Sequence, residues 1–154
     1  LIVGVVYEIN RDECFSAWKD GGAFLNGKAM RVSEAVELNN TLLATGFPFY
    51  DFEKQESYLQ VFKEFMKCCH GLRRIGSAAV DLAYTAAGRF DGYFEYNLNS
   101  WDAAAGIVLV REAGGEVCDF MGKDDMIEKR ELIATNGKIT AEMLAVISPR
   151  FYNT

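Results

Sequence analysis

The sequence predicts an α/β fold with α+β elements, in which the remnant of an antiparallel sheet precedes an α/β layer with helices on a mixed sheet. Two glycine-bearing turn signals divide the first 32 residues into short strand-like stretches. From residue 34 onward, strand-like and helix-like segments alternate, which favours helices packed on a largely buried sheet. The 154 residues, half of them hydrophobic, suffice for one core or two small lobes. We therefore expect the end of an N-terminal antiparallel sheet region at 1–33 and a C-terminal α/β domain at 34–154.

The first region alternates apolar residues with small or polar ones, as strands do. We expect three strands, at residues 3–7, 15–18 and 30–32, with turns at Asp20-Gly21 and Asn26-Gly27. No stretch of this region has a helical pattern. Its apolar face is therefore expected to have no helix over it and its edge to stay open, which favours self-association.

The second region combines buried strands with amphipathic helices. Residues 53–69 place apolar side chains at three- and four-residue intervals, which predicts a helix with one apolar face. Glycines end two further helices, and Pro149 follows the last. The expected strands are 41–45, 72–75, 91–95, 116–120 and 132–135, and the expected helices are 53–69, 77–87, 103–113 and 139–147.

Composition excludes several classes of function. Sixteen basic against twenty-two acidic residues give a net charge of −6, which argues against a nucleic-acid groove or an anionic membrane surface, because both need clustered Lys and Arg. No apolar run reaches membrane-spanning length, and none resembles a signal peptide. The four cysteines have no CxxC spacing. Reduced thiols in a cytoplasm are the simplest account of them.

Asp102 is the first candidate site residue. It precedes a helix whose first turn, Ala103 to Gly106, is almost without side chains, so that a ligand or another backbone can approach closely. Free N–H groups and the helix dipole favour a carboxylate at such a position. An oriented carboxylate is also what Mg²⁺ requires. From the residues alone, Asp102 is either a helix cap or a metal ligand, and capping is the more frequent role.

Two further positions join it. The stretch IGSAA at 75–79 runs from a strand through a glycine into a helix, and it exposes N–H groups that bind phosphate or hydroxyl oxygens readily. Glu95 stands where an apolar strand ends, which is equally typical of a solvated strand end. His70, the single histidine, has no nucleophile motif to serve, and Arg73 and Arg74 are most simply salt-bridge residues.

The stretch WDAAAGIVLVREAGG at 101–115 resembles the C-terminal signature of the inositol monophosphatase family. Three supporting stretches follow in the family's order and spacing: LATGFPF at 43–49, RRIGSAAV at 73–80 and DGYFE at 91–95. The resemblance covers essentially the whole chain, and its GFPF loop is most similar to bacterial members, the bacterial-type inositol-1-monophosphatases. It implies a sugar-phosphatase-like layered fold.

The resemblance also implies roles for individual residues. Asp102 matches the family's ligand to the second Mg²⁺, and Glu95 matches the residue that hydrogen-bonds a ring hydroxyl of the substrate. Gly76, Ser77 and Ala78 match the turn whose backbone, chiefly the Ala78 N–H, meets the sugar-like ring. Implied with them are a Mg²⁺ cofactor, a small sugar or polyol phosphate as substrate, a cytoplasmic location and a homodimer of the full-length form, with no nucleic-acid or membrane partner.

Two acidic motifs of the family have no counterpart in residues 1–154: a Gly-Asp/Glu-Glu cluster and Asp-Pro-(Ile/Leu)-Asp-Gly-Thr. We therefore expect this chain to be the C-terminal portion of a Mg²⁺-dependent phosphatase that hydrolyses inositol monophosphate with metal-activated water. No complete catalytic set is expected in it, and alone it should be folded but inactive. The alternatives are a fructose-bisphosphatase, a 3′-phosphoadenosine nucleotide phosphatase, or a non-catalytic binding or dimerisation module.

Overall fold

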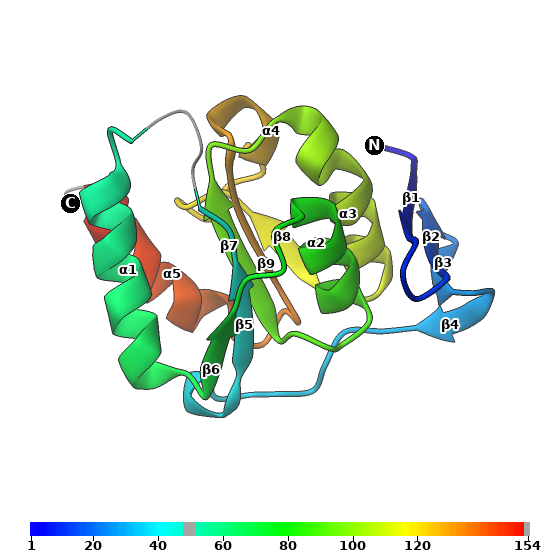
Figure 1. Cartoon of the computed structure of the whole chain (residues 1–154), viewed down its shortest axis with the longest axis horizontal. Helices are drawn as coiled ribbons and strands as arrows, with labels where there is room; N and C mark the ends of the chain where they lie inside the picture. Colours follow the sequence, from blue (N-terminus) through cyan, green and yellow to red (C-terminus); the bar gives the residue numbers. More distant parts are fainter. Residues whose placement is uncertain (48–51, 153–154) are drawn as a thin grey trace.

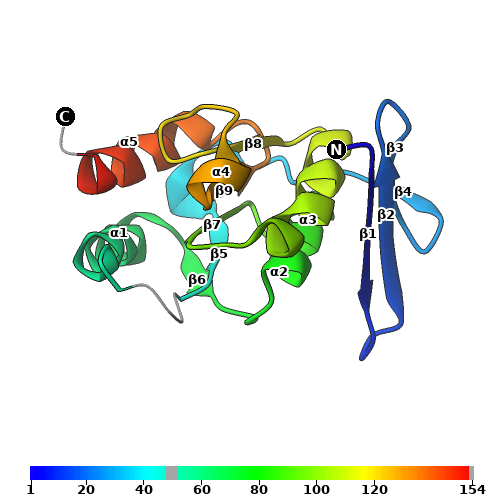
Figure 2. The ribbon, with the colours of Figure 1, turned by 90° about the horizontal axis from the view of Figure 1, so that it is seen from above.

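The fold is built of four layers that alternate helices and sheets (Figures 1 and 2). A computed structural model of the chain describes residues 1–47 and 52–152. One helical layer covers the outer face of a five-stranded sheet, a second helical layer lies on its inner face, and a four-stranded sheet packs on that second layer. The α/β architecture expected from the sequence is confirmed. Part of the GFPF loop, residues 48 and 49, falls outside the described residues.

The four-stranded sheet is an antiparallel meander of β1 (Val3–Glu8), β2 (Glu13–Trp18), β3 (Gly22–Leu25) and β4 (Lys28–Met30). The expectation of three strands is therefore wrong by one. Asn26 and Gly27 both have positive φ, 48° and 76°, and they form the two-residue turn that pairs β3 with β4. The turn was expected, but the short strand before it was not.

A helix does cover one face of this sheet, contrary to the sequence-based expectation. It is α3 (Ser100–Glu112), which comes from the other end of the chain and packs on β1 and β2. Gly4 lies so close to α3 that a Cβ there would overlap the Ala105 carbonyl oxygen. Phe15 and Ala17 are fully buried beneath the helix. The outer face keeps exposed apolar side chains, among them Val3, Val5, Tyr7 and Trp18.

The five-stranded sheet has the order β6-β5-β7-β9-β8. Its strands are β5 (Leu42–Thr45), β6 (Gly71–Arg73), β7 (Gly92–Tyr96), β8 (Glu116–Cys118) and β9 (Glu131–Thr135). The first three of these run parallel, and β9 is antiparallel to both β7 and β8. The mixed sheet is as expected. The proposed division at residues 33 and 34 lies in the connection between the two sheets, and as a domain boundary it stays a prediction.

Helices cover both faces of this sheet. On the outer face, α1 (Gln55–Cys68) and α5 (Thr140–Phe151) pack together over Phe94 and Ile133. On the inner face lie α2 (Ala78–Ala86) and α3, over Tyr93 and Leu132. Two short elements complete the set, the 3-10 turn η1 (Leu38–Asn40) and α4 (Met126–Lys129). Within the described ranges, no helix has the length and apolar character to cross a bilayer.

The last helix does not stop before Pro149, as the sequence suggested. α5 continues through Pro149 to Phe151. Proline removes one helical N–H and crowds the carbonyl of the preceding turn, so other contacts must hold the last turn of this helix. Below it, Ser148 donates a hydrogen bond to the Phe120 carbonyl at 2.5 Å, and the Tyr152 N–H closes the helix on the Ser148 carbonyl at 2.9 Å. Phe151 packs edge-on against Phe120. These contacts extend the helix by one turn.

The two inner helices approach each other through a glycine. A Cβ on Gly106 of α3 would overlap the Leu82 side chain of α2, and both residues are buried. The absence of a side chain at Gly106 therefore sets how closely α3 packs on α2. This spacing also fixes the relative positions of the two helix N-termini.

We predict that Gly106→Ala destabilises the chain by about 1–3 kcal/mol, because the added methyl overpacks this contact. In a helix without such a neighbour, the same change stabilises by roughly 0.5–1 kcal/mol. The sign of the stability change therefore shows whether Gly106 is closely packed. Urea denaturation of the wild type and the variant measures it. A variant as stable as the wild type, or more stable, would contradict close packing at Gly106.

Candidate functional site

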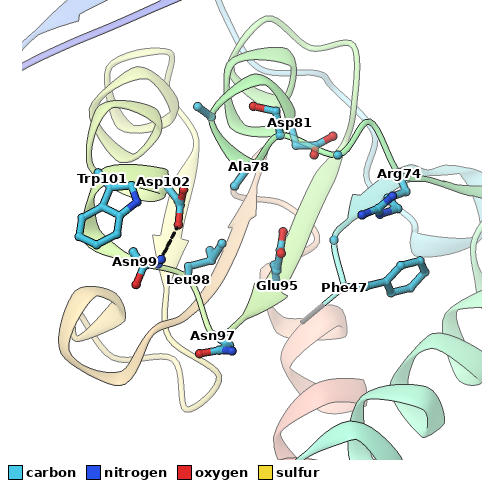
Figure 3. A pocket seen from close by; sticks show the side chains of 14 residues that line it. Phe47, Arg74, Ala78, Asp81, Glu95, Asn97, Leu98, Asn99, Trp101 and Asp102 are labelled. Atoms are coloured by element: carbon cyan, nitrogen blue, oxygen red, sulfur yellow. Dashed lines mark hydrogen bonds between the residues drawn. The ribbon is translucent and has the colours of Figure 1, made fainter. Parts of the chain in front are cut away.

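A pocket of about 400 Å³ opens where β5 and β7 end and where α2 and α3 begin (Figure 3). Because β5 and β7 are parallel, their carboxyl ends lie at the same edge of the sheet, the usual place for ligands in α/β folds. Segments far apart in the sequence meet there. The lining residues are Gly46, Phe47, Arg74, Gly76, Ser77, Ala78, Ala79, Asp81, Glu95, Asn97, Leu98, Asn99, Trp101 and Asp102.

Asp102 lies in the first turn of α3, at the third helical position, rather than before the helix. The helix begins at Ser100 and its N-cap is Asn99, so the expected start at 103 is wrong. The Asp102 Oδ2 atom accepts hydrogen bonds from the Asn99 backbone N–H at 2.9 Å and from Asn99 Nδ2 at 3.2 Å. Both bonds end on Oδ2 and the side chain is half-buried at the pocket wall. Asp102 thus stabilises the helix start and still faces the pocket.

Glu95 is a buried pocket residue and not a solvated strand end. It lies within β7, is 9% exposed, and accepts a hydrogen bond from the Tyr93 hydroxyl. Burial, with a smaller contribution from the charge of Asp102, raises the pKa of Glu95, and the Tyr93 hydrogen bond and the charge of Arg74 oppose this rise. The net result is a pKa of about 7. The carboxyl can therefore exchange its proton near neutral pH.

The Glu95 carboxyl rests directly on the backbone of Gly46. A Cβ at Gly46 would overlap all three atoms of the carboxyl group. Gly46 follows β5, and its carbonyl accepts a hydrogen bond from the Tyr58 hydroxyl. A glycine at this strand end thus makes room for the carboxyl. The sequence showed only the glycine of the GFPF loop, without the partner that requires it.

The N-terminus of α2 forms the upper wall of the pocket in Figure 3. Gly76 has a φ of 96°, a conformation that favours glycine, and Ser77 is the N-cap in extended conformation. The first backbone N–H of α2 that donates a hydrogen bond within the helix is that of Asp81, and its acceptor is the Ser77 carbonyl at 2.9 Å. The N–H groups before it are those that a helix leaves for caps and ligands. Gly76, Ser77 and Ala78 all line the pocket, together with Glu95 and Asp102.

Asp81 is a pocket residue that the sequence reasoning missed. It lies one turn into α2 and is 1% exposed. Burial and, to a smaller extent, the charge of Glu95 raise the pKa of Asp81, whereas a backbone hydrogen bond from Ile75 and the charge of Arg74 lower it. The net result is a pKa of about 7. In the sequence it was one polar residue in an apolar helix, and no short-range signal separates such a residue from a solvated one.

Arg74 was interpreted as a salt-bridge residue, and it lies at the pocket opposite Asp102 (Figure 3). Its guanidinium carbon is 5.2 Å from the centre of the Phe47 ring, a cation–π distance. His70 is exposed, follows α1, and does not line this pocket. His70 is thus a surface residue just beyond the end of a helix.

A second missed residue, Arg130, holds the loop between β7 and α3. Its side chain donates to the carbonyls of Leu98 (2.9 Å) and Asn97 (3.2 Å) and to Asn99 Oδ1 (3.1 Å). The Asn97 backbone has a φ of 65° in this loop. Since Asn99 in turn bonds Asp102, Arg130 fixes the carboxylate through the loop.

The described residues supply few ligands for a metal ion. Within residues 1–47 and 52–152, no group of three or more His, Cys, Asp or Glu side chains is placed to hold one. Asp102 offers a carboxylate oxygen of the kind that Mg²⁺ prefers, but Mg²⁺ needs six oxygen ligands in near-octahedral geometry. The chemistry of Asp102 fits a magnesium ligand, and the rest of the coordination sphere would need oxygens from water, substrate or other residues.

Comparison with known proteins shows a long match to one family. The model of the inositol monophosphatase family matches residues 1–150. The Nus factor SuhB of Escherichia coli K12 is 47% identical over 143 residues, which are 93% of this chain and 54% of that protein. The chain thus spans about half the length of the curated relatives it matches.

Solved structures agree with the sequence comparison. The crystal structure of the extragenic suppressor protein suhB from Bartonella henselae matches with a TM-score of 0.90 and 42% identity, over 95% of this chain and 56% of that one. The inositol monophosphatase of Anabaena matches with a TM-score of 0.85 and 35% identity, over 94% of this chain and 57% of that one. The layered fold implied by the resemblance is therefore confirmed.

We predict that Asp81→Asn stabilises the chain more at pH 8 than at pH 5. An acid whose pKa is raised on folding contributes stability below its unfolded pKa, and this contribution is lost as the pH rises through its folded pKa. For Asp81 the window runs from the model-peptide value of 3.8 to about 7. Between pH 5 and about 7 the difference between wild type and variant should grow by roughly 3 kcal/mol, because each pH unit inside the window contributes about 1.4 kcal/mol.

Urea denaturation at pH 5, 6.5 and 8 measures this difference. Asp124→Asn is the matched control, because Asp124 is 75% exposed and pairs with Arg111 on the surface. A stability difference between wild type and Asp81→Asn that stays constant with pH would show that Asp81 titrates normally.

Proposed function

Because the chain belongs to the inositol monophosphatase family, we propose that it forms the substrate-pocket part of a Mg²⁺-dependent phosphatase that hydrolyses inositol monophosphate. The observation that carries the proposal is the convergence of Asp102, Glu95 and the α2 N-terminus on one pocket. Three separate segments supply these groups, and each has the chemistry that its role in phosphate ester hydrolysis requires. The name of the Anabaena neighbour, inositol monophosphatase, supports the same reaction.

Asp102 is the proposed ligand to Mg²⁺. Its Oδ2 atom is held by Asn99, which orients the carboxylate as outer-shell hydrogen bonds orient metal ligands. Bound Mg²⁺ would supply Lewis-acid stabilisation of the phosphate and activation of water. The pocket is rich in carboxyl groups, so a phosphate monoester needs such a cation to enter it.

Glu95 and the α2 N-terminus are the proposed contacts to the alcohol part of the substrate. The Glu95 carboxyl is fixed by the Tyr93 hydroxyl and by Gly46, so it can accept a hydrogen bond from a ring hydroxyl without reorganising. The N–H groups at Ser77 and Ala78 can donate to a second oxygen of the ring. The substrate is thus oriented by groups that do not touch the phosphorus.

Two other functions have support. A related fructose-bisphosphatase or 3′-phosphoadenosine nucleotide phosphatase would use the same metal chemistry with a different alcohol. The curated relatives carry the name Nus factor SuhB, which favours, as a second candidate, a Nus factor role for this chain in place of catalysis. Such a role belongs to the class of non-catalytic binding modules, and it would not depend on the carboxylate of Asp102.

We predict that Asp102→Asn, in the full-length protein that contains this chain, abolishes most phosphatase turnover while the fold is kept. Asparagine can still accept the Asn99 hydrogen bonds, but it binds a hard cation poorly. The loss should exceed the roughly 10–100-fold that is typical of outer-shell partners. Phosphate release from inositol monophosphate is measured at several Mg²⁺ concentrations.

The surface variant Asp124→Asn controls for loss of a charge, since its partner Arg111 lies at the other end of α3. Near-normal activity of Asp102→Asn at ordinary Mg²⁺ would remove Asp102 from the metal site. The second candidate is tested in an Escherichia coli strain that lacks its own SuhB: if Asp102→Asn replaces the missing protein, the Nus factor role does not need the metal ligand.

We predict that Glu95→Gln changes substrate preference more than chemistry. The amide loses an acceptor for a ring hydroxyl but leaves the phosphate side of the pocket as it is. The ratio of kcat/KM for inositol monophosphate to that for p-nitrophenyl phosphate should fall by about tenfold. Equal losses on the two esters would contradict the assignment of Glu95 to the alcohol.

A further inference from the structure

Arg130 binds the loop between β7 and α3 from outside the pocket. Its Nε atom donates a hydrogen bond to the Leu98 carbonyl at 2.9 Å, and Nη2 donates to the Asn97 carbonyl at 3.2 Å and to Asn99 Oδ1 at 3.1 Å. The Leu98 N–H donates back to the Arg130 carbonyl at 3.2 Å. Three side-chain bonds and one backbone bond therefore join Arg130 to three successive residues that line the pocket.

The backbone of Arg130 has a left-handed conformation, with a φ of 59°. Such a conformation is unfavourable for a residue with a Cβ atom, whereas glycine adopts it readily. Other residues keep it where the surrounding contacts hold them in place, and they are frequent at functional sites. A glycine at position 130 would relieve the strain but would lose the bonds to the loop. The side-chain bonds of Arg130 therefore compensate for an unfavourable backbone.

In the part of the chain that the structure describes, Arg130 forms no ion pair with an acidic side chain. Its donors end instead on two backbone carbonyls and one side-chain amide oxygen. Arg111 and Arg150 differ from it, since both pair with acidic residues. The guanidinium of Arg130 is thus directed at the loop.

The Asn99 amide connects Arg130 to Asp102 (Figure 3). An arginine can only donate hydrogen bonds, so the Asn99 oxygen faces Arg130 and the Asn99 nitrogen faces Asp102. The Asn99 Nδ2 atom then donates to Asp102 Oδ2 at 3.2 Å, beside the Asn99 backbone N–H at 2.9 Å. Without Arg130, the amide can turn its oxygen toward the carboxylate, and two acceptors repel each other. Arg130 therefore determines which end of this amide meets Asp102.

We infer that Arg130 is a positioning residue that raises the affinity of the pocket for Mg²⁺ by fixing Asn99 and, through it, the carboxylate of Asp102. The inference rests on the proposed function and adds a residue that touches neither metal nor substrate. Asp102 already accepts two hydrogen bonds on Oδ2, so little ordering remains for the binding step. Partners of this kind typically change metal affinity by roughly 10–100-fold.

The test compares three variants of the full-length protein that contains this chain. Arg130→Gly removes the side chain and suits the left-handed backbone. Arg130→Lys keeps the charge but replaces the planar fork with a single ammonium group. Arg111→Ala is the control for loss of an arginine, because Arg111 pairs with Asp124 at the far end of α3.

Mn²⁺ is the probe, and electron paramagnetic resonance of the free ion follows its binding without any turnover. The dissociation constant of Mn²⁺ should rise by roughly 10–100-fold in Arg130→Gly, by a smaller factor in Arg130→Lys, and should stay unchanged in Arg111→Ala. The kcat at saturating Mg²⁺ should fall by a smaller factor than the Mn²⁺ affinity, because the ligand Asp102 is still present. A loss of kcat without a loss of Mn²⁺ affinity would overturn the inference.

A double variant tests whether Arg130 acts through Asn99. In an Asn99→Ala background, Arg130→Gly should weaken Mn²⁺ binding by less than about threefold, because the connection to Asp102 is already broken. Losses that multiply in full would show that Arg130 acts independently of Asn99, and they would overturn the inference.

The outcomes separate the inference from the proposed function. A wild type that binds Mn²⁺ with this dependence on Arg130 but releases no phosphate from inositol monophosphate would refute the phosphatase and support the role of Arg130. An active wild type whose Mn²⁺ affinity survives Arg130→Gly would refute the role and leave the phosphatase standing. A wild type that does not bind Mn²⁺ would refute both. If Arg130→Gly does not fold, Arg130→Lys decides, because wild-type affinity in that variant would overturn the inference.

Discussion

Close packing of α3 is the constraint on which the rest of the structure depends. The helix lies between the two sheets and beside α2, and two glycines make this possible: Gly4 admits the Ala105 carbonyl and Gly106 admits Leu82. A longer side chain at either position would push the layers apart. Because α3 begins at the pocket, its position also decides where Asp102 points. The contacts of α3 at Gly4 and Gly106 therefore determine both the spacing of the layers and the position of Asp102 in the pocket.

The electrostatics of the pocket follow from what these contacts bury. Asp81 and Glu95 are removed from water, and each has its pKa raised to about 7, while Asp102 keeps partners at its helix start. Carboxyl groups on this wall repel an anion unless a cation binds with it. They can form hydrogen bonds with uncharged hydroxyl groups. In the proposed function, the placement of a cation-bound phosphate near Asp102 and of a ring near Glu95 follows from this difference in burial.

Local patterns were enough to predict the mixed sheet and most helix positions. They drew attention to Asp102, Glu95 and the turn from Gly76 to Ala78, but only the family resemblance placed these residues in a common site. Local patterns did not predict the features that depend on contacts between distant segments of the chain. The α3 cover on the first sheet, the helix start at Ser100 and the continuation of α5 through Pro149 depend on tertiary contacts. Asp81 was missed for the same reason: its helix is apolar all round, and only the packing of α2 shows that this acid is buried.

The described residues contribute unequally to the two halves of the proposed reaction. For recognition of the alcohol, the proposal uses Glu95 and the start of α2, which line the same pocket. For the metal, the proposal uses Asp102, which is held in place by Asn99 and, through the loop, by Arg130. Mg²⁺ exchanges its bound waters only for several well-placed oxygens. A single carboxylate therefore does not complete a magnesium site. If the proposed function holds, these residues determine much of the choice of alcohol, and the metal needs oxygen ligands beyond Asp102.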